Sequence, residues 1–184
     1  MTELEILCRQ AYGAYEYLRD HDLTAESGTS RLLRSGNLPK LRLRMAEELD
    51  ELKGVIEGTH FHEGFDQDII LEGYEVWYWT ASLLVAQHVS YTEATPHVYL
   101  ETGFKLPITA GGQELPGFIQ ETLKLARAES TLMLKDLLTS NQALKSVGMA
   151  CALNNTPPTR LLERDLTEMR QKSYLEDYWQ TVKR

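Results

Sequence analysis

The chain has 184 residues, of which 42% are hydrophobic and 25% are charged, as in globular proteins that bury a core of their own. Its formal net charge of -8 at pH 7 argues against a nucleic-acid binder, which needs a basic surface to displace counterions from phosphates. The sequence has no membrane-length apolar run and no secretory signal features, so it predicts a cytoplasmic protein that does not interact with membranes.

In the first half of the chain, apolar residues recur at helical spacing, with capping residues between the segments. The helices that this pattern predicts cover about residues 3–19, 31–33, 37–58, 66–89 and 92–96. The segment Ser27–Ser30 and Asn37 supply N-cap candidates, and Gly58 is the expected end of the third helix. Thr92 is the expected cap of the last short helix, which should break near Pro96.

The second half begins with a glycine- and proline-rich stretch, which predicts a linker over residues 105–117. Further helices are expected over residues 118–138, 141–152 and 161–182. No strand alternation appears, so the predicted fold class is an all-α helical bundle. We divide it into a metal-binding bundle (residues 1–104) and a C-terminal helical extension (residues 105–184) that packs on the bundle or across a dimer. The apolar residues expected to bury a face of this extension include Phe118, Leu123, Leu125, Leu132, Leu134 and Leu138.

Two cysteines, Cys8 and Cys151, are far apart and lack CxxC spacing. This arrangement does not indicate a zinc knuckle or a disulfide framework. We expect both side chains to be buried thiols that pack as small apolar residues.

Five glutamates are concentrated on two predicted helices: Glu47, Glu48 and Glu51 on the third, and Glu72 and Glu75 on the fourth. Positions three or four apart share a helix face, and helices joined by a short loop pack antiparallel, so these carboxylates should converge. Glu48 also falls in a row of apolar residues that faces the core, where like charges repel unless cations neutralise them. Mg²⁺, or alternatively Mn²⁺, is the expected ion. The alternative is a solvated acidic helix face without a metal.

Two further groups each have a functional and a structural interpretation. His60 and His62 could ligate a metal, although a histidine pair in a loop is usually solvated. Tyr74, Trp77 and Tyr78 share a helix face and could stack on a base, although core packing or a dimer contact is the commoner role. The sequence has no phosphate-binding loop, dinucleotide fingerprint or nucleophile elbow, so the enzyme classes that depend on those motifs are excluded.

The spacing Glu47-Glu48-x-x-Glu51, followed after twenty residues by Glu72-x-x-Glu75, resembles the EExxE and ExxD signature of the all-α NTP pyrophosphatases, the MazG-like superfamily. The segments Ser27-Gly28-Thr29-Ser30-Arg31-Leu32-Leu33 and Arg44-Met45-Ala46-Glu47-Glu48 resemble more narrowly its phosphoribosyl-ATP pyrophosphohydrolase branch. The resemblance covers roughly residues 20–95. Three features depart from that branch: Glu75 replaces an Asp, Trp79 replaces a His, and residues 105–184 have no counterpart in its compact form.

The resemblance implies a bundle that cleaves a nucleotide between its α- and β-phosphates, giving a monophosphate and pyrophosphate. It implies four metal ligands: Glu48, Glu51, Glu72 and Glu75. It also implies that Glu47 binds a further ion or orients the attacking water. Glu47 and the neighbouring ligand Glu48 are therefore the predicted catalytic residues. The candidate contacts to the substrate phosphates are Arg31, Lys40 and Arg44. Family members are homodimers or homotetramers, so we expect the chain to self-associate.

Two questions stay open at this point. The substrate implied by the resemblance is either phosphoribosyl-ATP or a nucleotide removed by housecleaning enzymes, such as dUTP or an oxidised dNTP. The rival to an enzyme is a non-catalytic helical interaction or regulatory protein that retains the scaffold.

Overall fold

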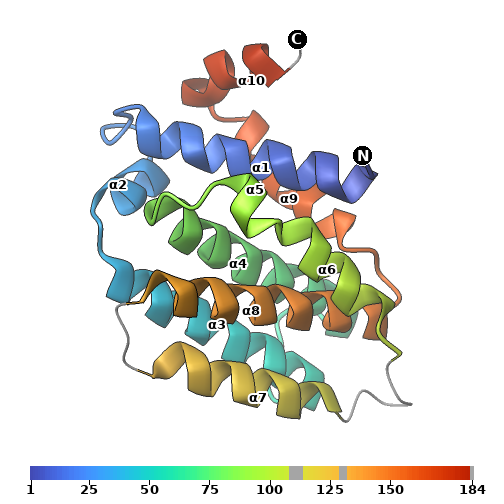
Figure 1. Ribbon diagram of the computed structural model, residues 1–184. Helices are drawn as coiled ribbons and strands as arrows, with labels where there is room; N and C mark the ends of the chain where they lie inside the picture. The colour runs from blue at the N-terminus through green and yellow to red at the C-terminus, as the bar shows by residue number, and fades with distance from the viewer. Residues whose placement is uncertain (108–113, 129–131, 183–184) are drawn as a thin grey trace.

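The computed structural model describes residues 1–107, 114–128 and 132–182, which form an all-α bundle (Figure 1). No strand occurs in these ranges, so the predicted fold class is confirmed. Among the same residues, no helix combines the length and the apolar character needed to cross a membrane. In chain order the elements are α1 (Glu3–Asp20), α2 (Gly28–Arg34), α3 (Leu38–Glu57), α4 (Phe65–Ala86), α5 (Tyr91–Ala94), α6 (Pro96–Lys105), α7 (Glu114–Arg127), α8 (Met133–Leu153), α9 (Thr159–Arg170), the 3₁₀ turn η1 (Ser173–Leu175) and α10 (Glu176–Val182).

Two helices of the first half have the caps that the sequence indicates, whereas α4 ends at Ala86 rather than near residue 89 and α6 was not predicted. The Ser27 hydroxyl accepts a hydrogen bond from the Ser30 amide at 3.1 Å, and the Asn37 side chain accepts one from the Lys40 amide at the same distance. These two caps satisfy amides that have no partner within the helix, so α2 and α3 start where predicted. Gly58 ends α3 with a φ of 72°, a left-handed conformation that favours glycine.

The short helix α5 differs from its prediction at the cap. Ser90 caps α5, not Thr92, because the Ser90 hydroxyl accepts from the Glu93 amide while the Glu93 carboxylate accepts from the Ser90 amide. The helix ends at Ala94, close to the expected break, and Pro96 then opens α6. Proline suits this position because its missing N–H would have no partner in the first turn of a helix.

The predicted helix over residues 118–138 is wrong. The structure has two helices, α7 ending at Arg127 and α8 running from Met133 to Leu153, so the helix predicted over 141–152 is only the later part of α8. One straight helix could not cover both partners, because α7 packs on α3 whereas α8 packs on α4 and α6. The apolar row expected across this segment is correspondingly broken, and its exposed members are Leu125, Leu132, Leu134 and Leu138.

The predicted linker and the last predicted helix also need correction. Pro116 and Gly117 lie in the first turns of α7 rather than in a linker, and residues 108–113 lie outside the described ranges. The helix expected over residues 161–182 ends at Arg170 and continues as η1 and α10. The change of direction lets α10 return to α1, where the Tyr178 hydroxyl donates to the Gln10 carbonyl at 2.7 Å.

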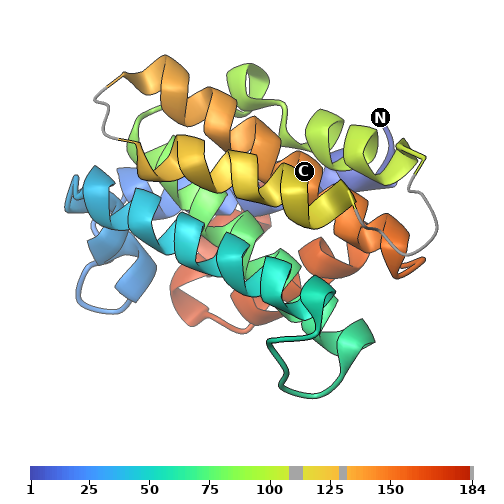
Figure 2. The ribbon, with the colours of Figure 1, turned by 90° about the horizontal axis from the view of Figure 1, so that it is seen from below.

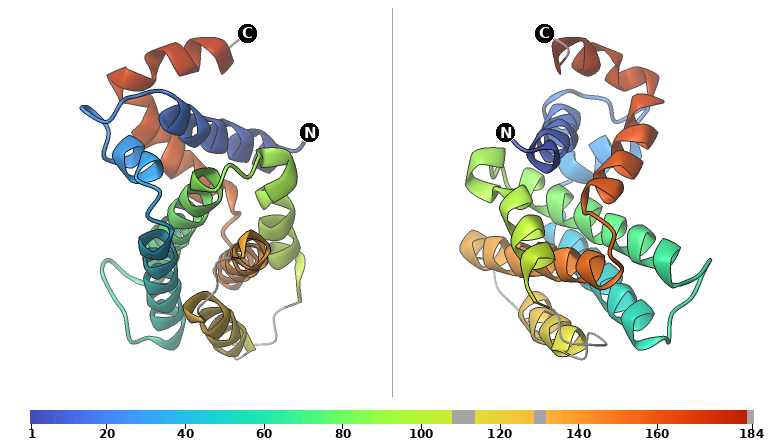
Figure 3. Two further views of the ribbon diagram at one scale, coloured as in Figure 1. Left: turned by 60° about the vertical axis from the view of Figure 1, so that its left-hand side comes forward. Right: turned by 90° about the vertical axis from the view of Figure 1, so that its right-hand side faces the viewer.

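The helix α4 lies at the centre of the bundle (Figure 3). On one side it packs against α3 and α8, which α7 covers, and on the other side it packs against α1 and α9. A single hydrophobic core runs through all these contacts. Large side chains that are fully buried in it include Tyr12, Leu41, Leu49, Leu52, Ile69, Trp77 and Leu100. Cys8 and Cys151 are buried free thiols, as predicted.

The helices α6 and α8 cross at two glycines. A Cβ atom added to Gly148 would lie 2.2 Å from the Leu100 carbonyl oxygen, and one added to Gly103 would lie 2.1 Å from the Lys145 carbonyl oxygen. Both distances are far below van der Waals contact, and both neighbours are backbone atoms that no side-chain rotation can move. The absence of side chains at these two positions therefore permits the close approach of the two backbones.

Two buried carboxylates join helices that are distant in sequence. Asp136 on α8, only 4% exposed, accepts two hydrogen bonds from the Arg42 guanidinium on α3, at 2.7 and 2.6 Å, and one from the Gln87 amide at 2.9 Å. Asp165 on α9 accepts from the Tyr15 hydroxyl on α1 and from the Trp77 indole on α4, the latter at 2.8 Å. Each acid fixes the relative positions of three segments, because a buried acceptor must keep its donors.

Asp165 is expected to make stability depend on pH. Its burial raises its pKa to about 7, against the effect of the hydrogen bonds from Tyr15 and Trp77. Because the folded state holds the proton more tightly than the unfolded state, this contribution is complete below about pH 4 and is lost as the pH rises to about 7. In Asp165→Asn the dependence disappears, so the unfolding free energies of wild type and variant should diverge by about 1.4 kcal/mol per pH unit in this window. Urea denaturation at several pH values measures this difference, and parallel curves would contradict the assignment.

Candidate metal centre between α3 and α4

Three of the predicted ligands converge where α3 and α4 pack side by side and are joined by the loop 58–64 (Figure 2). One carboxylate oxygen from each of Glu48, Glu51 and Glu72 lies within 4.8 Å of the other two. Two of these residues are buried: Glu48 is 4% exposed and Glu72 is 2% exposed. Oxygens at this separation, largely removed from water, can bind the same divalent ion or two neighbouring ions.

The other two predicted residues lie at the edge of this group. Glu75 is one turn beyond Glu72 on α4 and is half-buried, and its charge contributes to the raised pKa of Glu48. Glu47 is half-buried on α3 and lines a cavity beside Glu51. The two helices thus gather all five glutamates at one place, with Glu48, Glu51 and Glu72 at its centre.

The pKa values of the group show that its anionic form is disfavoured where the carboxylates lie. Burial raises the pKa of Glu48 to about 7; the charge of Arg44 opposes this effect, and the charges of Glu51, Glu75 and Glu72 add to it. Burial followed by the charge of Glu51 raises the pKa of Glu72, and burial raises that of Glu75. Carboxylates that are desolvated and close together are stable as anions only beside positive charge. The oxygen donors present therefore fit a hard divalent cation such as Mg²⁺ or Mn²⁺.

Arg44, a predicted phosphate contact, lies against the acidic group. Its guanidinium nitrogen Nη1 is 2.5 Å from Glu47 Oε2, and Nη2 donates to Glu48. The same guanidinium lies over the Trp79 ring, with its central carbon 5.0 Å from the ring centre. Arg44 therefore neutralises part of the carboxylate charge in this structure.

The other two predicted phosphate contacts lie away from the carboxylates. Arg31 is exposed on α2, where its guanidinium donates to the backbone carbonyl of Thr24. Lys40 is exposed in the first turn of α3, two turns before Glu48, which is about 12 Å along a helix axis. Neither forms an ion pair with the five glutamates.

The loop between the two helices brings two imidazoles to the same place. The Nε2 atom of His60 lies 3.4 Å from Glu72 Oε1, and that of His62 lies 3.3 Å from the same oxygen. The two Nε2 atoms are 2.8 Å apart, and His60 Nε2 is also 3.7 Å from Glu51 Oε2. The histidines are therefore directed at the acidic group rather than only at solvent, although His62 remains exposed.

Two residues of the helices hold this loop in place. The buried carboxylate of Asp68 accepts hydrogen bonds from the consecutive amides of His62, Glu63 and Gly64, at 3.0, 2.9 and 3.3 Å, and these bonds lower its pKa. At the other end, the Gly54 carbonyl accepts from the amides of Thr59 and His60. A Cβ atom on Gly54 would lie 2.8 Å from the His60 Cβ, so the glycine makes room for this histidine.

A cavity of about 310 Å³ opens beside the acidic group. Its lining consists of Glu47, Asp50, Glu51, Gly54, Thr59, His60 and Arg127. Arg127, at the end of α7, forms an ion pair with Asp50 at 2.7 Å. The sequence gives no local signal for Arg127, because 77 positions separate it from its partner. This arginine is therefore a cation at the site that only the packing of α7 on α3 reveals.

The aromatic face of α4 serves mainly to pack the core. Trp77 is fully buried and its indole donates to Asp165, so it cannot stack on a base. The Tyr78 hydroxyl lies 3.0 Å from the Thr29 hydroxyl on α2, and Tyr74 is half-buried. Of the two interpretations of this face, core packing is the one that the structure supports for Trp77.

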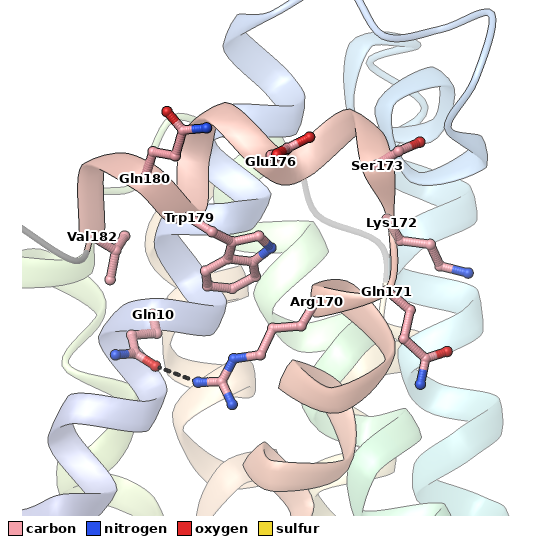
Figure 4. Close-up of a pocket in the computed structure, with 9 residues that line it drawn as sticks. All are labelled: Gln10, Arg170, Gln171, Lys172, Ser173, Glu176, Trp179, Gln180 and Val182. Carbon is pink, nitrogen blue, oxygen red and sulfur yellow. Dashed lines mark hydrogen bonds between the residues drawn. The ribbon is translucent and has the colours of Figure 1, made fainter.

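A larger cavity, of about 790 Å³, lies between α1, α9 and α10 (Figure 4). Trp179, Arg170 and Gln10 face one another across it, and an Arg170 guanidinium nitrogen donates to the Gln10 side chain at 3.2 Å. Glu176 is the one carboxylate in its lining. This cavity therefore lacks a set of metal ligands. The carboxylates that could bind a metal together lie between α3 and α4.

Comparisons with family models, curated proteins and solved structures found no match to this chain. The functional assignment therefore depends on the geometry of the site and on the motif resemblance.

Proposed function

We propose that this chain is a metal-dependent pyrophosphohydrolase that cleaves a nucleotide between its α- and β-phosphates. The observation that carries the proposal is the convergence of buried carboxylates from Glu48, Glu51 and Glu72 on two neighbouring helices. The EExxE and ExxE spacing of these residues supplies the reaction class by its resemblance to the all-α NTP pyrophosphatases.

In this proposal the carboxylates of Glu48, Glu51, Glu72 and Glu75 hold Mg²⁺ or Mn²⁺. The bound ions supply Lewis acidity, which activates water and neutralises the pyrophosphate leaving group. Glu47 lies at the cavity, half-buried, where its carboxylate can accept a proton from a water molecule.

The cations around the cavity have a part in the same proposal. Arg44 pairs with Glu48, whose charge a bound metal would neutralise, so one side of its guanidinium would become available to a phosphate when the ions bind. Arg127 lines the cavity and is a second candidate for the phosphates. Lys40 and Arg31 lie away from the carboxylates, so they would contact only those parts of a long substrate that extend beyond the metal site.

The alternative is a helical interaction protein that keeps the scaffold without turnover. A protein of this kind has no need for several carboxylates in a partly buried position, since such a group destabilises the fold when no cation is present. The burial of Glu48 and Glu72 therefore favours the enzyme.

The assay that tests the proposal is pyrophosphate release by the purified full chain. Nucleoside and deoxynucleoside triphosphates, dUTP and phosphoribosyl-ATP are each supplied with Mg²⁺ or Mn²⁺. We expect at least one of them to give a monophosphate and pyrophosphate in equal amounts, with no product in the presence of a chelator. Release of inorganic phosphate instead would show a different cleavage position. Absence of turnover across the panel with either metal would favour the interaction protein.

A further inference from the structure

We propose that His60, His62 and Glu72 form a binding site for a transition-metal dication of the Zn²⁺ type. The site lies at the loop end of the acidic group and shares Glu72 with the proposed catalytic centre. It goes beyond the proposed function, because metal binding by these three residues does not require the chain to hydrolyse anything.

The three ligand atoms have the arrangement of a coordination site. His60 Nε2 and His62 Nε2 are 2.8 Å apart, and Glu72 Oε1 lies 3.4 Å from the first and 3.3 Å from the second. For a triangle of this size, a point about 2 Å from all three atoms exists, which is the length of Zn–N and Zn–O bonds. Glu51 Oε2 lies 3.7 Å from His60 Nε2 and is a further carboxylate oxygen beside this group.

The site is held in this arrangement by the backbone around it. Asp68 accepts three consecutive amides of the loop, from His62 to Gly64, and the Gly54 carbonyl accepts the amides of Thr59 and His60. The backbone at both histidines is therefore fixed by hydrogen bonds that do not involve a metal, and it presents the two imidazoles beside Glu72. Less conformational entropy is lost when an ion binds to ligands that are already in place.

The ligand types determine which metal the site prefers. Imidazole nitrogens suit Zn²⁺, Co²⁺ and similar ions, whereas Mg²⁺ takes oxygen ligands and keeps much of its water. The group Glu48, Glu51 and Glu72 contains only oxygens, so the two sets of ligands differ in the metal that they select. Because Glu72 belongs to both sets, occupation of the histidine site would alter the ligands left to the carboxylate site.

A structural interpretation of the same contact is also available. One imidazole could donate its Nε2 proton to the other, since 2.8 Å is a hydrogen-bond distance. In that case the histidines would only close the loop over the acidic group, and they would not contribute to metal binding. The two interpretations differ in the effect of removing one imidazole.

The experiment is titration of the metal-free full chain with Co²⁺ and with Zn²⁺, followed by calorimetry and, for Co²⁺, by visible absorption. His60→Gln and His62→Gln are each expected to weaken binding of both ions by at least about tenfold and to change the Co²⁺ spectrum. Mg²⁺ binding in the same variants should change by less than about twofold, because Mg²⁺ prefers oxygen ligands. A matched control is His88→Asn, since His88 is exposed and asparagine tolerates its positive φ of 59°.

The loop is at the surface, so circular dichroism should show the same fold in all variants. The proposal is overturned if both variants bind Co²⁺ and Zn²⁺ as tightly as the wild type, because the carboxylates alone would then hold the ion. It is also overturned if the wild type shows no saturable binding of either ion. Pyrophosphate release by the wild type with Mg²⁺ tests the proposed hydrolase separately, so failure of one proposal does not imply failure of the other.

Discussion

Replacement of Glu72 by glutamine should abolish metal-dependent turnover and, at the same time, stabilise the metal-free protein. Glu72 is 2% exposed and belongs to both groups of candidate ligands. Loss of an outer-shell partner of a metal site typically reduces activity 10–100-fold, so loss of a direct ligand should reduce kcat by more than about 100-fold. Without metal, the neutral amide replaces a carboxylate whose pKa is raised by burial and then by the charge of Glu51, which should add about 1 kcal/mol of stability, or about 2–4 °C in Tm.

Glu57→Gln is the matched control for this experiment. Glu57 lies on α3 but is exposed, and among the described residues it forms an ion pair with Lys53 alone, at 3.0 Å, so its variant should keep wild-type turnover and Tm. Pyrophosphate release and thermal unfolding with and without Mg²⁺ measure both effects. Unchanged turnover in Glu72→Gln, together with the wild-type rise in Tm on adding Mg²⁺, would remove Glu72 from the site.

The largest loss of stability is expected from Gly148→Ala. Its Cβ would lie 2.2 Å from the Leu100 carbonyl oxygen and 2.9 Å from the Phe104 amide nitrogen, both on the backbone of α6. The two helices would have to separate, and overpacking of this kind typically costs 1–3 kcal/mol and occasionally more. We expect a loss of about 3 kcal/mol, which corresponds to a Tm lower by about 6–12 °C in a protein of this size.

Gly117→Ala is the same substitution at an open position, and it is expected to raise the stability of the protein rather than lower it. Gly117 lies in α7, and its added Cβ would meet no atom of the other described residues within 4 Å apart from its own helix, so alanine should stabilise the helix by up to about 1 kcal/mol. Thermal unfolding of the two variants compares a crowded with an open position. Equal Tm values for both would show that the α6–α8 crossing can relax, contrary to the packing described above.

Much of the first half of the fold follows from local signals. Ser27 and Asn37 each offer a side-chain acceptor to an amide three residues on, and Gly58 supplies a left-handed end, so the sequence predicts these boundaries well. The second half is less predictable because tertiary contacts decide it. Residues 118–138 have continuous helical character, yet α7 ends at Arg127 and a separate helix α8 begins at Met133, since the two helices pack on different neighbours.

The candidate site likewise has one part that the sequence predicts and one part that depends on tertiary contacts. The helical period places Glu48 beside Glu51 and Glu72 beside Glu75, so the carboxylate row is predictable from spacing alone. The position of the histidines depends on Asp68, whose carboxylate binds three loop amides. Their approach to Glu72 therefore follows from backbone geometry that residue types do not specify. The self-association implied by the family resemblance stays a prediction.

The contact of Asp165 with Tyr15 and Trp77 has a consequence for how the protein is made. Synthesis proceeds from the N-terminus, and 150 positions separate Tyr15 from the acid that accepts its hydrogen bond. While the ribosome is still adding α8, the Tyr15 hydroxyl and the Trp77 indole lack the Asp165 acceptor, and the surface of α1 that α9 covers is open to water. The contact between α1 and α9 therefore forms only after α9 has emerged, and until then the nascent chain exposes an apolar surface of the kind that chaperones bind.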